Sequence, residues 1–294
     1  MDKYNGEDLE TLHPPKWQLF TSSFFPNKSL KQLYELKEMI LDLDPDVLSL
    51  TEVGGPESLE NFNHFFLEDK YKVYCEPSNS DRGIDLGYMV KKDLKYKVEI
   101  KNHVKKRLEN GKKFSRGVME LRLSLDESYV YINFLCHLKS KLNLKRVDFE
   151  GRGQRSAEIN FLRDLYLKTS SKYDKIPISI SGDFNGIIFE DETEEEFLPL
   201  LSATNLKDVF DLQNKPIELR MSYCYFNRQG SRYPMQLDYF LIDEKFSSLI
   251  DKETTLLGFK PPYTDTFELP NSMKEKRDLP SDHFALLIKL KIKS

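Results

Sequence analysis

The 294-residue sequence has few cysteines and no long apolar run. Cys75, Cys136 and Cys224 cannot all pair with one another and show no CxxC spacing, which argues against a disulfide framework and against a zinc site. No apolar stretch approaches the roughly 18 to 20 residues that a membrane span needs. The N-terminus has no apolar segment after a basic start, so the sequence predicts no secretory signal and favours the cytoplasm.

A strong net charge is also missing. The formal charge of −4 provides no general attraction to nucleic acid, and 39% hydrophobic with 31% charged residues is typical of a globular chain. The charge is unevenly distributed, because eleven Lys or Arg residues between Lys91 and Arg116 stand against three acidic residues. A second basic cluster runs from Lys139 to Arg155. These clusters are candidate phosphate-binding surfaces, although solvated surface lysines explain them equally well.

Periodic patterns predict an α+β fold. Residues 29–44 have apolar positions at helical spacing after a Ser29 to Gln32 capping box, which predicts an amphipathic helix, and a second helix is expected over 155–168. Many strands interrupted by few helices favour a layered sandwich of two mixed sheets packed face to face, with helices outside. We expect one domain over 1–294, with 1–16 as an N-terminal extension. The expected strands are 47–51, 71–75, 84–90, 95–100, 118–125, 131–138, 176–181, 221–225, 238–242 and an alternating stretch over 286–293.

Acidic or histidine side chains stand at the ends of five of the apolar segments. Four carboxylates gathered about 4 Å apart would repel one another by roughly 4 kcal/mol per pair at an effective dielectric near 20, so their convergence implies a bound cation. Carboxylate, amide and imidazole ligands without a thiolate favour Mg²⁺ or Mn²⁺ over zinc. The residues are Glu52, His137, Asp183 with Asn185, Asp238, and Asp282 with His283.

Each of these residues has a structural explanation when it is taken alone. Glu52 stands before a Gly-Gly turn, and Asp183 with Asn185 could form a tight turn in which both side chains bond their own backbone. Asp238 is harder to explain, because it shares a strand face with Phe240, where an unpaired carboxylate is costly to bury. The hypothesis of a metal-assisted hydrolase therefore depends on the whole set.

In this order, the segments resemble the endonuclease/exonuclease/phosphatase superfamily. The matching stretches are PDVLSLTEVGG, DRGIDLGYMV, INFLCHLKS, ISGDFNG, LDYFLID and SDHFALL. The combination of GDFN and SDH at this separation is more specific than either motif alone. The resemblance implies the DNase I-like four-layered α/β sandwich, with the site at one edge where loops from both sheets meet.

The resemblance also implies which residues bind the metal and which activate the attacking water. Glu52 matches the family's metal-binding glutamate, and Asp282 matches the acidic residue beside the metal. Asp183 and Asn185 match the pair that orients and deprotonates the attacking water. Family members usually carry an asparagine at the end of the first strand, whereas this sequence reads WQLFTSSFFPN there. The replacement is then Ser22, Ser23 or Asn27, and metal affinity is expected to change.

The histidines and basic residues are expected to bind the substrate phosphate or to assist its cleavage. His283 matches the histidine that contacts the scissile phosphate, and Asp238 matches the carboxylate that fixes its tautomer and supports its positive charge. His137 matches the histidine that helps the leaving oxygen depart in the deoxyribonuclease branch. The residues expected to contact substrate phosphates are Arg116, Lys139, Arg152 and Arg155.

Three functions remain open from the sequence. The leading hypothesis is a monomeric, divalent-metal-dependent phosphodiester hydrolase that cleaves DNA by in-line attack of water activated by Asp183. One alternative keeps the chemistry and changes the substrate to a phosphomonoester or a phospholipid head group. The other is a catalytically silent module that binds nucleic acid or protein.

Overall fold

The computed structural model describes residues 28–141, 148–189 and 192–292. The helices are α2 (Leu30–Leu43), α3 (Pro56–Phe66), α4 (Arg152–Lys172), α5 (Leu198–Ala203), α6 (Val209–Leu212) and α7 (Met273–Asp278), with short 3₁₀ turns at Phe149–Gly151, Glu195–Phe197, Ile217–Leu219 and Glu244–Leu249. The strands are β1 (Val47–Val53), β2 (Tyr71–Cys75), β3 (Asp85–Lys91), β4 (Lys97–Asn102), β5 (Val118–Leu125), β6 (Ser128–His137), β7 (Ile178–Asp183), β8 (Leu206–Asp208), β9 (Tyr223–Phe226), β10 (Arg232–Met235), β11 (Asp238–Asp243), β12 (Thr255–Leu257) and β13 (Ala285–Leu287).

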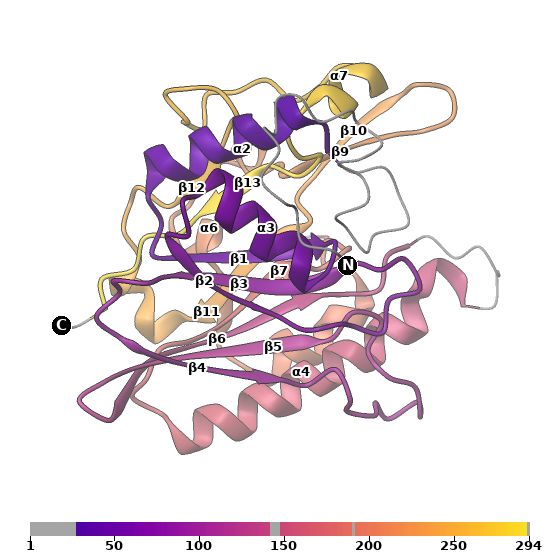
Figure 1. The fold of residues 1–294 in the computed structure, drawn as a ribbon. Helices are drawn as coiled ribbons and strands as arrows, with labels where there is room; N and C mark the ends of the chain where they lie inside the picture. The colour runs from indigo at the N-terminus through magenta and orange to yellow at the C-terminus, as the bar shows by residue number, and fades with distance from the viewer. Residues whose placement is uncertain (1–27, 142–147, 190–191, 293–294) are drawn as a thin grey trace.

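Two layers of sheet form the middle of the molecule (Figure 1). Within the described residues, the larger sheet has six strands in the order β4-β5-β6-β7-β11-β8, in which β6 and β7 are parallel and the other neighbours are antiparallel. The facing layer contains the sheet β1-β3-β2 and the pair β12-β13. Strands β9 and β10 form a separate hairpin.

Apolar clusters hold the layers together. The cluster between the sheets includes Tyr88, Leu121, Leu135 and Phe240. A second cluster joins the outer face of the six-stranded sheet to α4, and others lie beneath α2 and α3. Figure 1 shows α2 and α3 on one side of the sheets and α4 on the other. The predicted four-layered sandwich is therefore confirmed; the six-stranded sheet is mixed, whereas the described strand pairs of the facing layer are all antiparallel.

The helix predictions differ in how well their ends were placed. Helix α2 has the predicted capping box between Ser29 and Gln32, and it ends where Asp44 adopts a left-handed conformation. Helix α4 begins three residues earlier than expected, because the Asp148 carboxylate accepts the backbone N–H groups of Gly153 and Gln154 at 2.9 and 3.0 Å. Helix α3 was not predicted; Pro56 stands at its first turn, where a missing N–H costs nothing.

The C-terminal segment is less regular than its sequence suggests. Of the stretch expected over 286–293, only Leu286 and Leu287 lie in β13, since its partner β12 is itself three residues long, and a single bridge joins Leu290 to Ile250 further on. The alternation is nevertheless confirmed, because Leu286, Ile288 and Ile292 pack against the core between the sheets. The three cysteines are free. Within the described residues, no helix is long and apolar enough to span a membrane.

The buried carboxyl of Asp208 predicts a pH-dependent stability. Burial raises its pKa from 3.8 to about 7, so the folded state keeps a proton that the unfolded chain releases at lower pH. The free energy of unfolding should therefore fall as the pH rises through this window and level off above it. An asparagine at this position does not ionise, so it should not lose stability as the pH rises. Gln236 donates to Asp208 at 2.8 Å, and the buried Oε1 of Gln236 could accept a hydrogen bond from the amide of the new asparagine.

We expect Asp208→Asn to be more stable than the wild type by roughly 1 to 4 kcal/mol at pH 8 and by much less at pH 4.5, at 1.36 kcal/mol per unit of pKa shift. Urea unfolding at the two pH values measures this difference. A stability difference that is equal at both pH values would contradict the raised pKa of Asp208.

Candidate active site

Strand register places three of the expected residues in one row. His137 ends β6 and pairs with Asp183 at the end of β7, which in turn pairs with Asp238 at the start of β11. Directly paired residues project to the same face of a sheet, and neighbouring strands lie about 4.8 Å apart. His137 Nε2 accordingly lies 3.4 Å from Asp183 Oδ2. The row faces the second layer, because Phe240, on the same face of β11 as Asp238, belongs to the core between the sheets.

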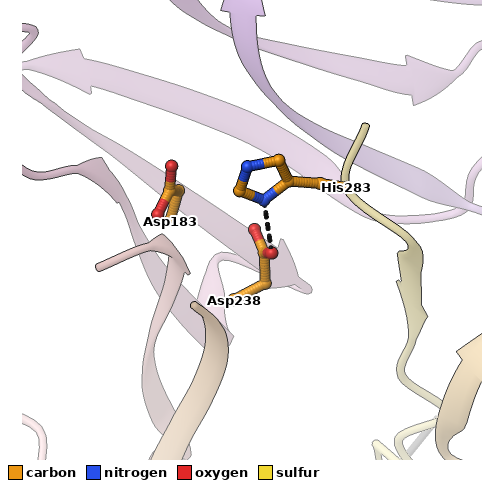
Figure 2. Close-up of side chains that lie close together, drawn as sticks. All are labelled: Asp183, Asp238 and His283. Atoms are coloured by element: carbon orange, nitrogen blue, oxygen red, sulfur yellow. Dashed lines mark hydrogen bonds and ion pairs between the residues drawn. The ribbon is translucent and has the colours of Figure 1, made fainter. Parts of the chain in front are cut away.

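His283 reaches this row from the C-terminal segment. A bridge to Tyr223 at the start of β9 fixes its backbone, and the Tyr223 ring packs against the imidazole at 4.6 Å between centroids. His283 Nδ1 is hydrogen-bonded to Asp238 Oδ2 at 2.7 Å. Figure 2 shows the imidazole beside Asp183 and joined to Asp238 by this bond. One ligand atom from each of these three residues lies within 4.8 Å of the other two.

The local environment shifts the pKa values of Asp183, His283 and His137 in different directions. Burial, partly offset by the positive charge of His283, raises the pKa of Asp183 to about 7. Burial also lowers the pKa of His283, but the carboxylate of Asp238 outweighs this effect and the pKa rises to about 10. Burial and the guanidinium of Arg116 hold the pKa of His137 well below its usual value. At neutral pH, His283 is therefore an imidazolium and His137 is neutral.

The turn after β7 fixes the orientation of the Asp183 carboxylate. The backbone N–H of Asn185 donates to Asp183 Oδ1 at 2.8 Å, and its side-chain amide donates to Oδ2 at 3.0 Å. The same amide also donates to the carbonyl of Leu138 at 3.1 Å. Asn185 has a φ of 50°, a left-handed conformation that asparagine tolerates better than most residues. The self-bonded turn that could explain these residues structurally is present, and it also holds a carboxylate in the row.

Glu52 and Asp282, the expected metal ligands, come from segments far apart in the chain but share the electrostatic surroundings of the row. A bulge in β1 gives Glu52 a φ of 55°, and its carboxylate lies 3.5 Å from Arg82. Asp282 lies 3.5 Å from the ammonium group of Lys276. Burial raises the pKa of Tyr223 to about 12, and Asp282, Asp183 and Glu52 all add to the rise. Three carboxylates therefore act on the same tyrosine hydroxyl.

The carboxylates of Glu52 and Asp282 have the donor chemistry that a hard divalent cation takes. The side chains of Glu52 and Asp282 are 45% and 51% exposed, so their oxygens are open to a ligand from solution. Carboxylate oxygens are what Mg²⁺ and Mn²⁺ prefer. The Asp183, Asp238 and His283 group is a less suitable place, because His283 Nδ1 already bonds Asp238 and the imidazole is positively charged. Residues 22, 23 and 27, named as replacements for the family's asparagine, lie outside the described residues.

Of the basic residues expected at the phosphate, Arg116 lies nearest to the row. It is 6% exposed, and its guanidinium donates to the carbonyl of Leu138, directly after His137. Lys139 follows in the same segment and is half-buried. Arg152 is exposed at the first residue of α4, next to Glu150 at 3.7 Å.

Arg155 requires a correction. Its side chain is fully buried, and its guanidinium binds Glu196 and donates to the carbonyls of Lys139 and Glu150 at 2.8 and 3.1 Å. These bonds use the donors that a phosphate would need. The sequence pattern could not show this, because a basic residue on a helix looks the same whether it faces solvent or a carboxylate. We therefore infer that Arg155 stabilises the segment around Lys139 and does not bind substrate.

Glu158 was not expected at the site, yet it joins two of the site's segments. Its carboxylate is fully buried and accepts the backbone N–H of Ser115 and of Lys139, both at 2.8 Å. It also accepts the Ser115 hydroxyl and the amide of Gln154. The residue before Arg116 and the segment after His137 are thus fixed to α4. No sequence signal marks this role, because Glu158 reads as an ordinary polar position of a helix.

Tyr223 and Lys276 were also missed. Lys276 is 8% exposed; its ammonium group lies 3.5 Å from the centroid of the Tyr223 ring and donates to the carbonyl of Cys224 at 3.0 Å. Both residues support the segment that carries Asp282 and His283. The cation–π contact depends on the meeting of β9 and α7, which local sequence patterns do not reveal.

The architecture is that of the endonuclease/exonuclease/phosphatase proteins. No protein-family model matches the chain, and no curated protein matches it in sequence. Solved structures do match it. An endonuclease/exonuclease/phosphatase family protein from Bacteroides thetaiotaomicron superposes with a TM-score of 0.54 at 12% identity, covering 90% of this chain and 90% of that one.

Two further solved structures are similar over most of their length. The catalytic domain of human Nocturnin with a bound sulfate anion gives a TM-score of 0.63 at 19% identity, covering 94% of this chain and 92% of that one. D. rerio TDP2, complexed with a single-strand DNA product, gives 0.60 at 15% identity and covers 88% and 91%. At these identities the similarity establishes the fold.

Gly182 provides a test of how closely β6 and β7 must approach beside the site. Its φ is 127°, and a Cβ atom there would lie 1.9 Å from the carbonyl oxygen of Cys136. Gly182→Ala should therefore lower the free energy of unfolding by more than about 2 kcal/mol, because backbone must move to relieve the clash. Thermal or urea unfolding measures the loss.

The matched control is Gly111→Ala. Gly111 has a φ of 75° but no atom within 4 Å of the added Cβ, so only the backbone strain remains, at roughly 1 to 2 kcal/mol. Equal losses for the two variants would mean that the contact between Gly182 and β6 is not as tight as the structure has it.

Proposed function

We propose that the protein is a divalent-metal-dependent phosphodiester hydrolase that cleaves nucleic acid, with DNA as the leading substrate. The observation that carries the proposal is the row of His137, Asp183 and Asp238 with His283 bonded to it. This arrangement puts a carboxylate of raised pKa beside an imidazolium. Hydrolysis of a phosphodiester needs both a base for water and a positive donor for the phosphate oxygens.

Asp183 is assigned as the general base. A carboxyl group with a pKa of about 7 is ionised enough at neutral pH to accept a proton and basic enough to do so effectively. The two hydrogen bonds from Asn185 fix the direction in which the carboxylate points. Because neutral His137 is 2% exposed and lies 3.4 Å from Asp183, we assign it to the support of Asp183 in preference to the expected contact with a leaving oxygen.

His283 is assigned to the phosphate. Asp238 bonds Nδ1 and thereby leaves Nε2–H as the donor, while the negative charge of Asp238 stabilises the imidazolium. Glu52 and Asp282 would hold Mg²⁺ or Mn²⁺, which when bound would stabilise the negative charge that develops on the phosphate oxygens. Arg116, Lys139 and Arg152 are proposed phosphate contacts. The single domain over 1–294, the monomeric state and the cytoplasmic location remain predictions.

Support for nucleic acid as the substrate comes from two sources. The D. rerio TDP2 structure of the same fold contains a single-strand DNA product. The basic residues around the site provide a surface that suits a polyanion. A phosphomonoester or a phospholipid head group would use the same chemistry, so the substrate panel below includes both.

The function is tested by incubating the protein with supercoiled plasmid, a single-stranded oligonucleotide, RNA, a chromogenic phosphodiester, a phosphomonoester and sphingomyelin, each with Mg²⁺, Mn²⁺ or a chelator. We expect DNA cleavage that the chelator abolishes. Asp183→Asn should lower kcat at least about 100-fold, because it removes the base. Release of phosphate or phosphocholine without any cleavage of nucleic acid would replace the proposed substrate class.

Asp208→Asn is the matched control for this experiment. Asp208 is also a buried carboxyl whose pKa is raised to about 7, but it lies at the end of β8, accepts the side-chain amide of Gln236 and stands outside the row. Its variant should keep activity near that of the wild type. Equal losses for Asp183→Asn and Asp208→Asn would mean that the loss reflects a disturbed fold and not a missing base.

The raised pKa of Asp183 also predicts the acid side of the pH profile. Since the ionised carboxylate accepts the proton, activity should rise about tenfold per pH unit at low pH and level off above a pKa of about 7. Initial rates of chromogenic phosphodiester hydrolysis at saturating metal, measured between pH 5 and 9, give this limb. A limb near pH 4 would be inconsistent with a buried Asp183 as the base.

A further inference from the structure

The basic sequence between Lys91 and Arg116 contains a loop in which several cations stand close together, and this loop differs in its ion pairing from the strands on either side. The strand lysines of this run each have a carboxylate partner: Lys91 with Asp44, Lys97 with Glu127 and Lys101 with Glu99. The loop between β4 and β5, residues 104–114, does not follow this pattern. Its cations are Lys105, Lys106, Arg107, Lys112 and Lys113, which are all exposed.

No carboxylate among the described residues pairs with the four lysines of this basic loop. The loop contains one acidic residue, Glu109, and that side chain accepts the amide of Asn160 on α4 at 2.6 Å. Arg107 donates to the carbonyl of Gly111 within the loop at 2.9 Å. The loop therefore presents concentrated positive charge that no carboxylate ion pair offsets within the part of the chain that the structure describes.

The basic loop is held in place from three sides. Leu108 and Phe114 are buried in the cluster that joins α4 to the six-stranded sheet. Asn79 donates its amide to the carbonyls of Val104 and Phe114 at 2.8 and 3.1 Å, at the two ends of the loop. Gln154 of α4 donates to the carbonyl of Lys113 at 2.9 Å. A fixed loop loses little conformational entropy when a ligand binds its side chains.

The loop lies at the end of the sheet that carries the active site. Val118, the first residue of β5, pairs with Cys136, the neighbour of His137 (β4 ends and β5 begins toward the right in Figure 1). Lys113 is three residues from Arg116, a distance that the chain can span over at most about 11 Å. One strand of a duplex carries a phosphate about every 3.4 Å along its axis, so this reach covers about three phosphates.

We propose that the basic loop binds the phosphate backbone of a nucleic-acid strand on one side of the scissile phosphate. The inference rests on the proposed function and extends it, because it identifies the substrate as a polymer that presents several phosphates along one strand. Lysines that form no ion pair among the described residues suit this role, since no such pair must break before a phosphate binds. The basic loop thus favours a polymeric substrate over a small phosphate ester.

The test is binding of a fluorescent single-stranded oligonucleotide in the presence of chelator, which separates binding from cleavage. The loop variant carries Lys105→Gln, Lys106→Gln, Lys112→Gln and Lys113→Gln; Arg107 is left unchanged because it bonds the loop backbone. We expect the affinity near 0.1 M salt to fall at least about tenfold. The slope of log K against log salt should become shallower by roughly 0.7 for each phosphate that the variant no longer binds, or about 3 in total.

A control variant carries four Lys→Gln changes at the opposite end of the six-stranded sheet, at Lys245, Lys252, Lys289 and Lys291. These side chains are exposed near Asp243, the last residue of β11, whereas Asp238 at the other end of β11 belongs to the site. The control changes the net charge equally. Its affinity and salt slope should stay close to those of the wild type.

Three results would overturn the inference. The loop variant could bind the oligonucleotide as the wild type does, or the control variant could lose as much affinity as the loop variant. The loop variant could also lose binding only to vesicles of anionic phospholipid, which would make the loop a membrane contact. In the loop variant, the rate of chromogenic phosphodiester hydrolysis should stay within about twofold of the wild-type rate. If the wild type is inactive on every phosphodiester, the proposed function is refuted. The binding comparison still decides the role of the loop in that case.

Discussion

The register of β7 between β6 and β11 is the constraint on which the rest of the site depends. It aligns His137, Asp183 and Asp238 across three strands, and a slip of one residue would turn Asp183 to the other face of the sheet. Buried polar contacts oppose such a slip. Asn133 of β6 accepts the hydroxyls of Ser179 and Ser181 at 2.7 and 3.1 Å, and these bonds form only when the strands pair as they do.

The same alignment creates an electrostatic problem that the surrounding residues resolve. Asp183 and Asp238 are direct neighbours across two strands, and two ionised carboxylates at this separation would repel each other. Burial favours a proton on Asp183, and Asp238 is neutralised by the imidazolium of His283. One carboxylate can therefore accept a proton while the other holds a positive charge. The two acids differ because His283, from the C-terminal segment, bonds only one of them.

Much of the fold and of the site could be read from local patterns, and the errors have physical causes. The capping box of α2, the buried face of β6 and the strand ends at Glu52, Asp183 and Asp238 are determined by residues close together in the chain. Arg155 was misassigned because its partner Glu196 is 41 residues away. Glu158 was overlooked for the same reason, since its partners Ser115 and Lys139 are 43 and 19 residues away. A buried ion pair and a solvated one look alike until the chain has folded.

The sequence by itself determined which segments form strands, which faces are apolar and which polar residues stand at strand ends, because these properties follow from alternation and helical spacing over a few residues. Only the tertiary structure decided that His283 bonds Asp238, that Asp183 is a buried acid, and that Lys91, Lys97 and Lys101 have carboxylate partners whereas the lysines of residues 104–114 have none among the described residues. These properties depend on distances between segments far apart in the chain, and on the burial that shifts each pKa.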